Sequence, residues 1–196
     1  MTVTSIEFDD VVAYAVDAEL SIIAYCIFGM PGQTIREMTD TLISLAGKQV
    51  LIGPSIYYPS PGTVLFDECE KSGFLPVSQS QWRSSAFPVE TSDFSRLDLV
   101  TLFRLTRMIN FLKGRIKSGD IPAGISWKDL YALLEVENNN YSVNNMWKEF
   151  VLSVKKDLSF SFVIRPGNGI DNKVKAQTSA KVLDYFFSES CDKHVY

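Results

Sequence analysis

Two apolar runs near the start of the chain dominate its hydrophobic pattern. Residues 20–28 (LSIIAYCIF) and 50–58 (VLIGPSIYY) are apolar at successive positions, which is typical of strands covered on both faces in a parallel sheet. Between them, Thr34 and Glu37 form a T-x-x-E capping box, which predicts that a helix begins there and continues to about residue 46, before Gly47. Two strands joined by one helix predict a βαβ unit with adjacent parallel strands.

The rest of the pattern predicts a mainly helical chain. Residues 7–18 have the spacing of a short amphipathic helix, and residues 96–117 have a wide apolar face that predicts the longest helix. The polar stretch 76–95 predicts a long surface loop. We therefore expect an α/β part over 1–75, a linker loop over 76–95 and a helical region over 96–196. The other expected elements are helices over 64–72, 127–135, 143–157 and 173–187, with Ser126 and Ser142 as N-caps. Residues 158–164 alternate as a strand does, and we expect either a strand or an extended segment there, followed by a loop over 165–172.

Composition and charge narrow the class of protein. The 196 residues are 46% hydrophobic and 21% charged, with a net charge of −4, and this acidic balance argues against a nucleic-acid partner. The nearest approach to a basic cluster is KGRIK, Lys113 to Lys117, which we interpret as a solvated helix face. The N-terminal sequence lacks the pattern of a signal peptide, and no apolar run is long enough to span a membrane. The expected location is the cytoplasm, without a membrane partner.

Candidate chemistry is sparse. The turn GMPGQTIR after the first apolar run lacks the lysine and the spacing of a phosphate-binding loop. The single histidine, His194, lies near a chain end that we expect to be mobile and exposed, and one histidine supports neither a catalytic triad nor a His-rich metal site. Cys26 is expected to be a small buried hydrophobe, and the acidic neighbours of Cys69 and Cys191 should raise thiol pKa values. We predict no catalytic residue and no metal ligand.

Two stretches in order carry a resemblance to a known family. ELSIIAYCIFGMPGQTIREMTDTL followed by VLIGPSIYYPSPGTVLFDECEKSGFL resembles the C-terminal half of the radical S-adenosylmethionine barrel. The branch in question includes cobalamin-dependent members and the oxygen-independent coproporphyrinogen oxidases. In that family a strand ends in an [IV]-x-G-[LM]-P-G-x-T turn, and the next strand ends near a P-x-P-G-T element. The resemblance covers roughly residues 5 to 75, and the remainder is similar to the helical tail of some members.

The resemblance implies a fragment of a partial (β/α)6 barrel, followed by a mainly α-helical region. The strand ends of the full-length family surround S-adenosylmethionine and a 4Fe-4S cluster, whose electron generates a 5′-deoxyadenosyl radical. Carried over by position, Ile27 would pack against the adenine, and Tyr25 stands where some relatives hold a ribose-binding aspartate. Gly53 and Ile56 would offer backbone groups to the adenine edge. These four residues are the candidate cofactor-binding set.

One family feature is missing from the sequence. The chain contains no C-x3-C-x2-C spacing for the cluster, so the resemblance implies a C-terminal fragment that is inactive alone and binds neither S-adenosylmethionine, the 4Fe-4S cluster nor cobalamin tightly. The expected partner is an N-terminal half-barrel, encoded in the same gene or as a separate chain, and strand 20–28 would be an exposed edge through which copies can associate. Two alternatives remain open: an interaction or scaffold module derived from such a barrel, and an independent small-molecule-binding α/β domain.

Overall fold

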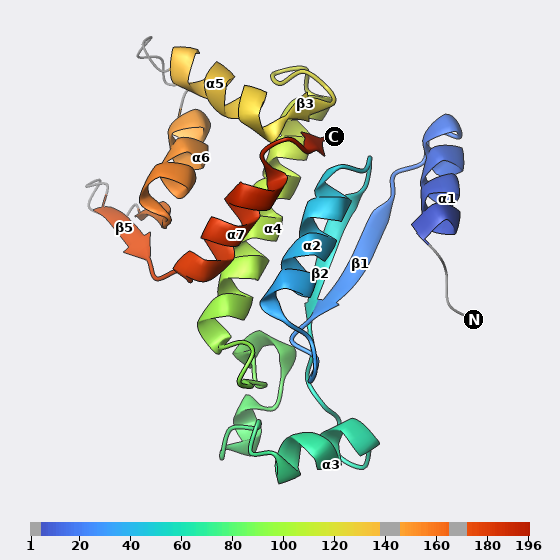
Figure 1. The fold of residues 1–196 in the computed structure, drawn as a ribbon, viewed down its shortest axis with the longest axis vertical. Coiled ribbons are helices and arrows are strands. Elements are labelled where there is room, and N and C mark those ends of the chain that lie inside the picture. The colour runs from blue at the N-terminus through green and yellow to red at the C-terminus, as the bar shows by residue number, and fades with distance from the viewer. Residues whose placement is uncertain (1–4, 138–145, 165–171) are drawn as a thin grey trace.

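The computed structural model describes residues 5–137, 146–164 and 172–196. It is a mixed α/β structure, about 54% helical. The described residues contain seven α-helices and a two-stranded parallel sheet. In Figure 1 helices α2, α4 and α7 lie side by side next to this sheet, α1 stands at one flank, and α3 lies below the strands. None of the helices in these three described ranges is both long and apolar enough to cross a bilayer.

The predicted βαβ unit is confirmed. Strand β1 (Ile23–Phe28) pairs in parallel with β2 (Leu51–Ile56), and helix α2 (Ile35–Ala46) connects them. The capping box sets the start of α2, because the Thr34 backbone N–H donates to Glu37 Oε2 at 2.8 Å and the Glu37 N–H donates to Thr34 Oγ1 at 3.2 Å. Helix α1 (Ser5–Asp17) precedes this unit, and α3 (Val64–Lys71) follows it.

The prediction that both faces of these strands are covered is wrong. Along β1, buried and exposed side chains alternate, with Ala24, Cys26 and Phe28 buried against the helices. Ile23 and Tyr25 lie on the opposite face and are 52% and 79% exposed. The sheet therefore has one face packed on α2 and α4 and one face open.

Most helices of the second half lie where the pattern places them. Helix α4 (Arg96–Lys117) has the predicted bounds, α5 (Trp127–Glu137) begins after the expected cap Ser126, and α6 spans Met146–Asp157. The proposed cap Ser142 and most of the loop over 165–172 lie outside the described residues. The loop over 76–95 carries two short 3₁₀ turns, η1 (Gln79–Gln81) and η2 (Ser84–Ala86).

The predicted helix over 173–187 is wrong in its first part. Residues Asn172–Ala176 form strand β5, which pairs antiparallel with β4 (Phe160–Ile164), and helix α7 covers Ala180–Ser190. The sequence KVKA alternates as a strand does, but these residues form a strand because their backbone pairs with residues 160–164.

The last residues of the chain are anchored, in contrast to the mobile end expected from the sequence. His194–Val195 forms strand β6, paired with β3 (Ile125–Ser126), and Val195 is fully buried. The His194 side chain is exposed, as predicted. The core runs from this end through α4, α5, α7 and α2 to the covered face of the sheet. Its fully buried members include Leu42, Leu99, Leu105, Ile109, Trp127, Leu134 and Phe186.

Candidate functional site: an open face and an open edge of the parallel sheet

Three of the four candidate cofactor residues lie together on the open face of the sheet. Tyr25 and Ile27 are 79% and 51% exposed, and Gly53 stands opposite Tyr25 in the register. A Cβ atom at Gly53 would come within 2.7 Å of Tyr25 Cδ1, so the tyrosine ring lies directly over this glycine. The open face thus presents an aromatic ring beside aliphatic side chains, which suits contact with a planar apolar group.

Ile56, the fourth candidate, does not share this face. Its side chain is 4% exposed and belongs to the core on the helix-covered side. Only its backbone remains available for the role that the resemblance implies.

The glycine-rich turn at the end of β1 has a structural explanation. Gly29 is buried at φ +86°, and a Cβ there would lie 2.9 Å from Leu99 Cδ1 of α4. Gly32 also has a positive φ, +83°, but nothing lies within 4 Å of a Cβ at that position. Both glycines therefore permit the left-handed backbone of the turn, and Gly29 also lets α4 approach the sheet.

Gly29→Ala should lower the free energy of unfolding by about 1.5 kcal/mol, because the alanine would have to adopt a left-handed backbone and its Cβ would crowd Leu99. Gly32→Ala is the matched control, because it has the same backbone strain without the contact and should lose only about 1 kcal/mol. Urea unfolding of the two variants measures both values. Equal losses would show that the approach of Leu99 contributes nothing.

Backbone hydrogen bonds show which residues of β1 face its partner strand. The Leu51 N–H donates to the Ile22 oxygen at 2.9 Å, and the Tyr57 N–H donates to the Phe28 oxygen at 2.8 Å. Successive residues of a strand direct their backbone N–H and C=O groups to opposite edges of the strand. The backbone groups of the even-numbered residues of β1 therefore point toward β2. The odd-numbered residues direct their N–H and C=O groups away from the sheet.

These outward groups form what we call the open edge, the backbone of Ile23, Tyr25 and Ile27. Within the part of the chain that the structure describes, a hydrogen bond reaches only one of them: Gln33 Nε2 donates to the Ile27 oxygen at 3.2 Å. The Gln33 side chain is itself held by the turn, since its Oε1 accepts from the Met30 N–H at 2.9 Å. The open edge coincides with the residues whose side chains lie on the open face.

The other edge of the sheet is closed. Asn110, on α4, accepts from the Ile52 N–H at 2.9 Å and donates to the Ile52 oxygen at 2.8 Å, so its amide replaces a neighbouring strand. The next outward position of β2 is Pro54, which has no N–H to donate. The sheet can thus be extended beside β1 but not at these positions of β2.

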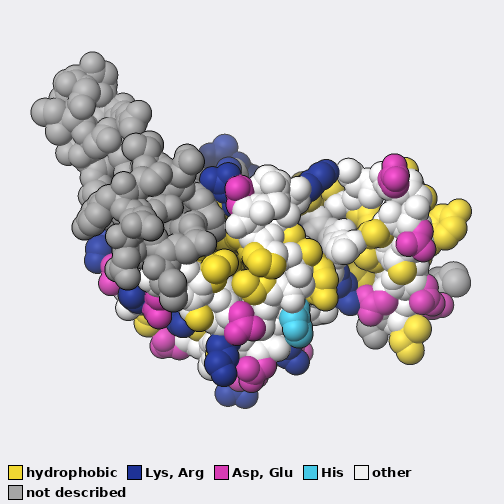
Figure 2. Space-filling model, turned by 90° about the horizontal axis from the view of Figure 1, so that it is seen from above, with side chains coloured by type: hydrophobic (Ala, Val, Ile, Leu, Met, Phe, Trp, Pro, Cys, Tyr) yellow, Lys and Arg dark blue, Asp and Glu magenta, His cyan; other side chains and the backbone are white. Residues whose placement is uncertain are grey.

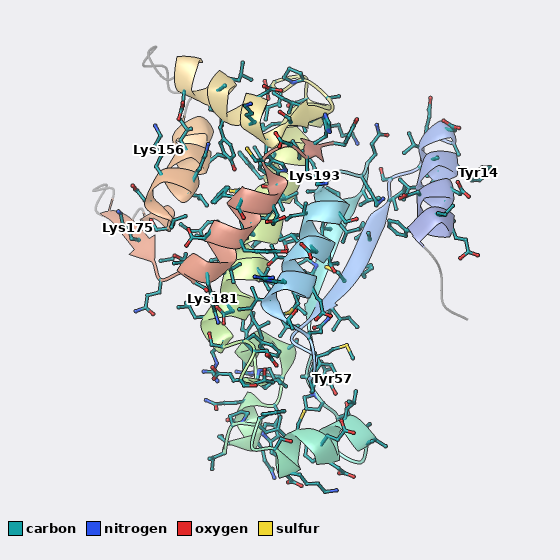
Figure 3. All side chains as sticks on the ribbon, in the orientation of Figure 1. Tyr14, Tyr57, Lys156, Lys175, Lys181 and Lys193 are labelled. Atoms are coloured by element: carbon teal, nitrogen blue, oxygen red, sulfur yellow. The ribbon has the colours of Figure 1, made fainter. Side chains whose placement is uncertain are left out.

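Helix α1 also exposes apolar side chains. Val12 is buried against the rest of the chain, whereas Ile6, Val11 and Tyr14 are 72%, 63% and 76% exposed. Figure 3 shows Tyr14 pointing away from the body of the molecule. A helix with apolar side chains on two sides is typical of one that lies between two layers.

A cavity of about 480 Å³ lies at the opposite end of the strands from the glycine-rich turn. Figure 2 looks onto this end, where the molecule narrows between α1 and the remainder and hydrophobic side chains lie on both sides of the constriction. The lining is mostly apolar, from the end of α1, the starts of both strands, the end of α4 and Tyr196, with Glu19, Lys113 and Lys117 as its charged members.

Lys113 contradicts the interpretation of KGRIK as a solvated face. Its side chain is 6% exposed, and Nζ donates to the backbone oxygens of Ala46, Lys48 and Tyr196 at 2.8, 2.6 and 2.7 Å. Burial lowers the pKa of Lys113 from 10.5 to about 8, while the three oxygens act against this by stabilising the ammonium. The lysine joins α4, the end of α2 and the last residues of the chain.

Two of the three cysteines are buried thiols with a raised pKa. Cys26 is buried on the covered face of the sheet, and burial raises its pKa to about 11. Burial, with a smaller contribution from Glu68, also raises the pKa of the Cys69 thiol. Cys191 is exposed, at the C-terminal end of α7. Among the described residues no group of three or more His, Cys, Asp or Glu side chains is placed to hold a metal ion.

Sequence reasoning missed Asn110, Gln33 and Lys113. Asn110 had a detectable signal, because it is a polar residue inside the apolar stretch of the longest helix. Lys113 had none, since its three acceptors come from distant parts of the chain. No protein-family model and no curated protein matches this chain.

Proposed function

We propose that this chain contributes one wall of the adenosyl-binding site of a radical S-adenosylmethionine barrel, which a partner half-barrel completes beside β1. The asymmetry of the sheet is the observation that carries this proposal. Asn110 and Pro54 close the β2 edge, whereas β1 offers free backbone groups and an open face. A parallel βαβ unit of this kind is what the last part of such a barrel requires.

The open face of the sheet also supports an adenosyl-binding wall. Ligands of α/β barrels lie at the carboxyl ends of the strands, where β1 runs into the glycine-rich turn. Tyr25, Ile27 and the backbone of Gly53 would form the wall against adenine. This wall fits an apolar ring, but Tyr25 supplies no carboxylate for a ribose. The buried thiols of Cys26 and Cys69 do not fit a four-iron cluster, so the partner would supply its ligands.

The test compares the chain alone with the chain co-expressed with a half-barrel that carries C-x3-C-x2-C. Under anaerobic conditions with iron and sulfide, the chain alone should hold no stoichiometric four-iron cluster and should bind S-adenosylmethionine with a dissociation constant of about 1 mM or weaker by calorimetry. The complex should hold the cluster and bind at micromolar concentrations. Tyr25→Lys should weaken the binding of S-adenosylmethionine to the complex. The control Tyr58→Lys, at an exposed tyrosine outside the wall, should leave this binding unchanged.

One observation favours a second candidate, an independent small-molecule-binding domain. The cavity between α1 and the strand starts is formed by this chain alone. A monodisperse monomer that binds S-adenosylmethionine at micromolar concentration would support that candidate and overturn the barrel proposal. A complex that forms but binds no S-adenosylmethionine would instead indicate the scaffold alternative.

A further inference from the structure

The open edge of β1 has a self-complementary arrangement. Ile23, Tyr25 and Ile27 direct their backbone groups outward at equal spacing about Tyr25. Two β1 strands related by a two-fold axis run antiparallel. With the axis at Tyr25, each Tyr25 lies opposite the other, and each Ile23 lies opposite the Ile27 of the second copy. All of these are positions with outward N–H and C=O groups, so each opposed pair can exchange two hydrogen bonds.

We propose that two copies of this chain pair through β1 in this register, forming a four-stranded sheet in the order β2-β1-β1-β2. This dimer is a resting state that masks the open edge. The dimer itself follows from the edge geometry, but its role rests on the proposed function, because it is the partner half-barrel that has to displace the second copy.

Charge and composition favour a second copy as the occupant. From Leu20 to Phe28 the chain has no charged residue and no proline, so two β1 strands meet without like-charge repulsion and without an edge-protecting side chain. The exposed side chains of Ile23, Tyr25 and Ile27 from both copies lie on the same side of the joined sheet and form one continuous apolar surface.

The closed edge makes this association finite. In the dimer the outer strands are β2, and Asn110 and Pro54 block them. An isologous contact with both outer edges closed ends at two copies and does not continue into a fibre. The same asymmetry that directs a partner to β1 therefore limits self-pairing to a dimer.

Gln33 weakens this dimer. Its Nε2 occupies the Ile27 oxygen, which is the acceptor that the Ile23 N–H of the second copy requires. In the proposed register both copies must release this contact. Gln33→Leu frees the oxygen and should tighten dimerisation.

Sedimentation velocity of the full chain over a wide range of protein concentration tests the proposal. The unmodified chain should show a monomer–dimer equilibrium, and Gln33→Leu should shift it toward dimer. Tyr25→Pro removes the N–H at the axis, an outward group that β2 does not use, and should weaken dimerisation about tenfold or more. Tyr25→Ala is the matched control: it loses the ring but keeps the N–H, so it should dimerise more tightly than Tyr25→Pro.

Amide hydrogen exchange of the unmodified chain gives a readout that does not depend on a variant folding. The Ile23, Tyr25 and Ile27 amides should become protected as protein concentration rises. A chain that stays monomeric, with these amides unprotected, would overturn the dimer. So would a dimer that Tyr25→Pro and Tyr25→Ala affect equally.

Neither measurement involves S-adenosylmethionine or the half-barrel, so failure of the proposed function leaves the dimer result intact. Adding the half-barrel should dissociate the dimer. A complex that binds S-adenosylmethionine while β1 remains paired with a second copy would overturn both the resting-state role and the placement of the half-barrel beside β1.

Discussion

Asn110→Leu should lower the free energy of unfolding by about 3 kcal/mol, because it leaves two backbone groups of a buried residue without partners. Ile52 is 2% exposed, and in the native chain both its N–H and its oxygen are bonded to the Asn110 amide. Leucine fits the apolar surroundings of α4 but cannot donate or accept. Denaturant unfolding monitored by circular dichroism measures the loss.

Asn110→Asp is the informative control. An aspartate can still accept from the Ile52 N–H but cannot donate to the Ile52 oxygen, so its loss should fall between those of the native chain and the leucine variant. A leucine variant as stable as the native chain would show that water replaces the amide at this edge.

Asn110→Leu should also change the oligomeric state. With the Asn110 amide gone, the β2 edge is blocked only by Pro54, and the sheet has open groups on both sides. Association should then continue past the dimer to larger species as protein concentration rises. Sedimentation velocity distinguishes this outcome from simple unfolding, and Asn110→Asp should show less of it.

Features encoded by neighbouring residues could be predicted from the sequence. The capping box of Thr34 and Glu37 lies within one turn, and its two hydrogen bonds need no distant partner. The apolar periodicity of residues 96–117 likewise fixes both bounds of α4. The βαβ unit followed from two apolar runs and one capped helix, since connections of this kind leave few arrangements.

The open face could not be predicted, because an apolar run does not say what covers it. Residues 20–28 are apolar on both alternating faces, and this pattern indicates burial only when a second layer is present. In the structure the helices supply one layer, and no described residue packs over Tyr25 on the other face. The prediction of a helix over residues 173–187 was wrong in its first part for a related reason. Residues 172–176 form a strand because they pair with residues 160–164, and local periodicity does not show that pairing.

The two edges of the sheet show how much of the site depends on distant contacts. Asn110 closes β2 from a helix that begins forty residues after the strand ends, near Arg96, whereas Gln33 reaches Ile27 from the adjacent turn. The first contact cannot be inferred from β2 itself. The closure of the β2 edge is therefore a property of the tertiary structure, whereas an open edge at strand 20–28 was already implied by the resemblance.

Lys113 gives the second large expected effect, and it is a dependence on pH. The pKa of Lys113 falls from 10.5 to about 8 on folding. A lysine with a lower pKa in the folded state binds its proton less tightly there, so between pH 8 and pH 10.5 unfolding takes up a proton. Raising the pH through this range therefore disfavours unfolding and increases stability.

Relative to Lys113→Met, the native chain should gain roughly 2 kcal/mol of unfolding free energy between about pH 7 and pH 9.5. The comparison with methionine removes the ammonium of Lys113 and leaves the other charged residues of the chain in place. Lys117→Met, at an exposed position of the same helix, is the matched control, because it removes a lysine from α4 without removing the buried ammonium. A fall in the difference with rising pH would mean that the oxygens of Ala46, Lys48 and Tyr196 outweigh burial and hold the ammonium in place. The sign of this pH dependence therefore shows which effect dominates the pKa of Lys113. Burial lowers that pKa, whereas hydrogen bonds from the ammonium to the three backbone oxygens raise it.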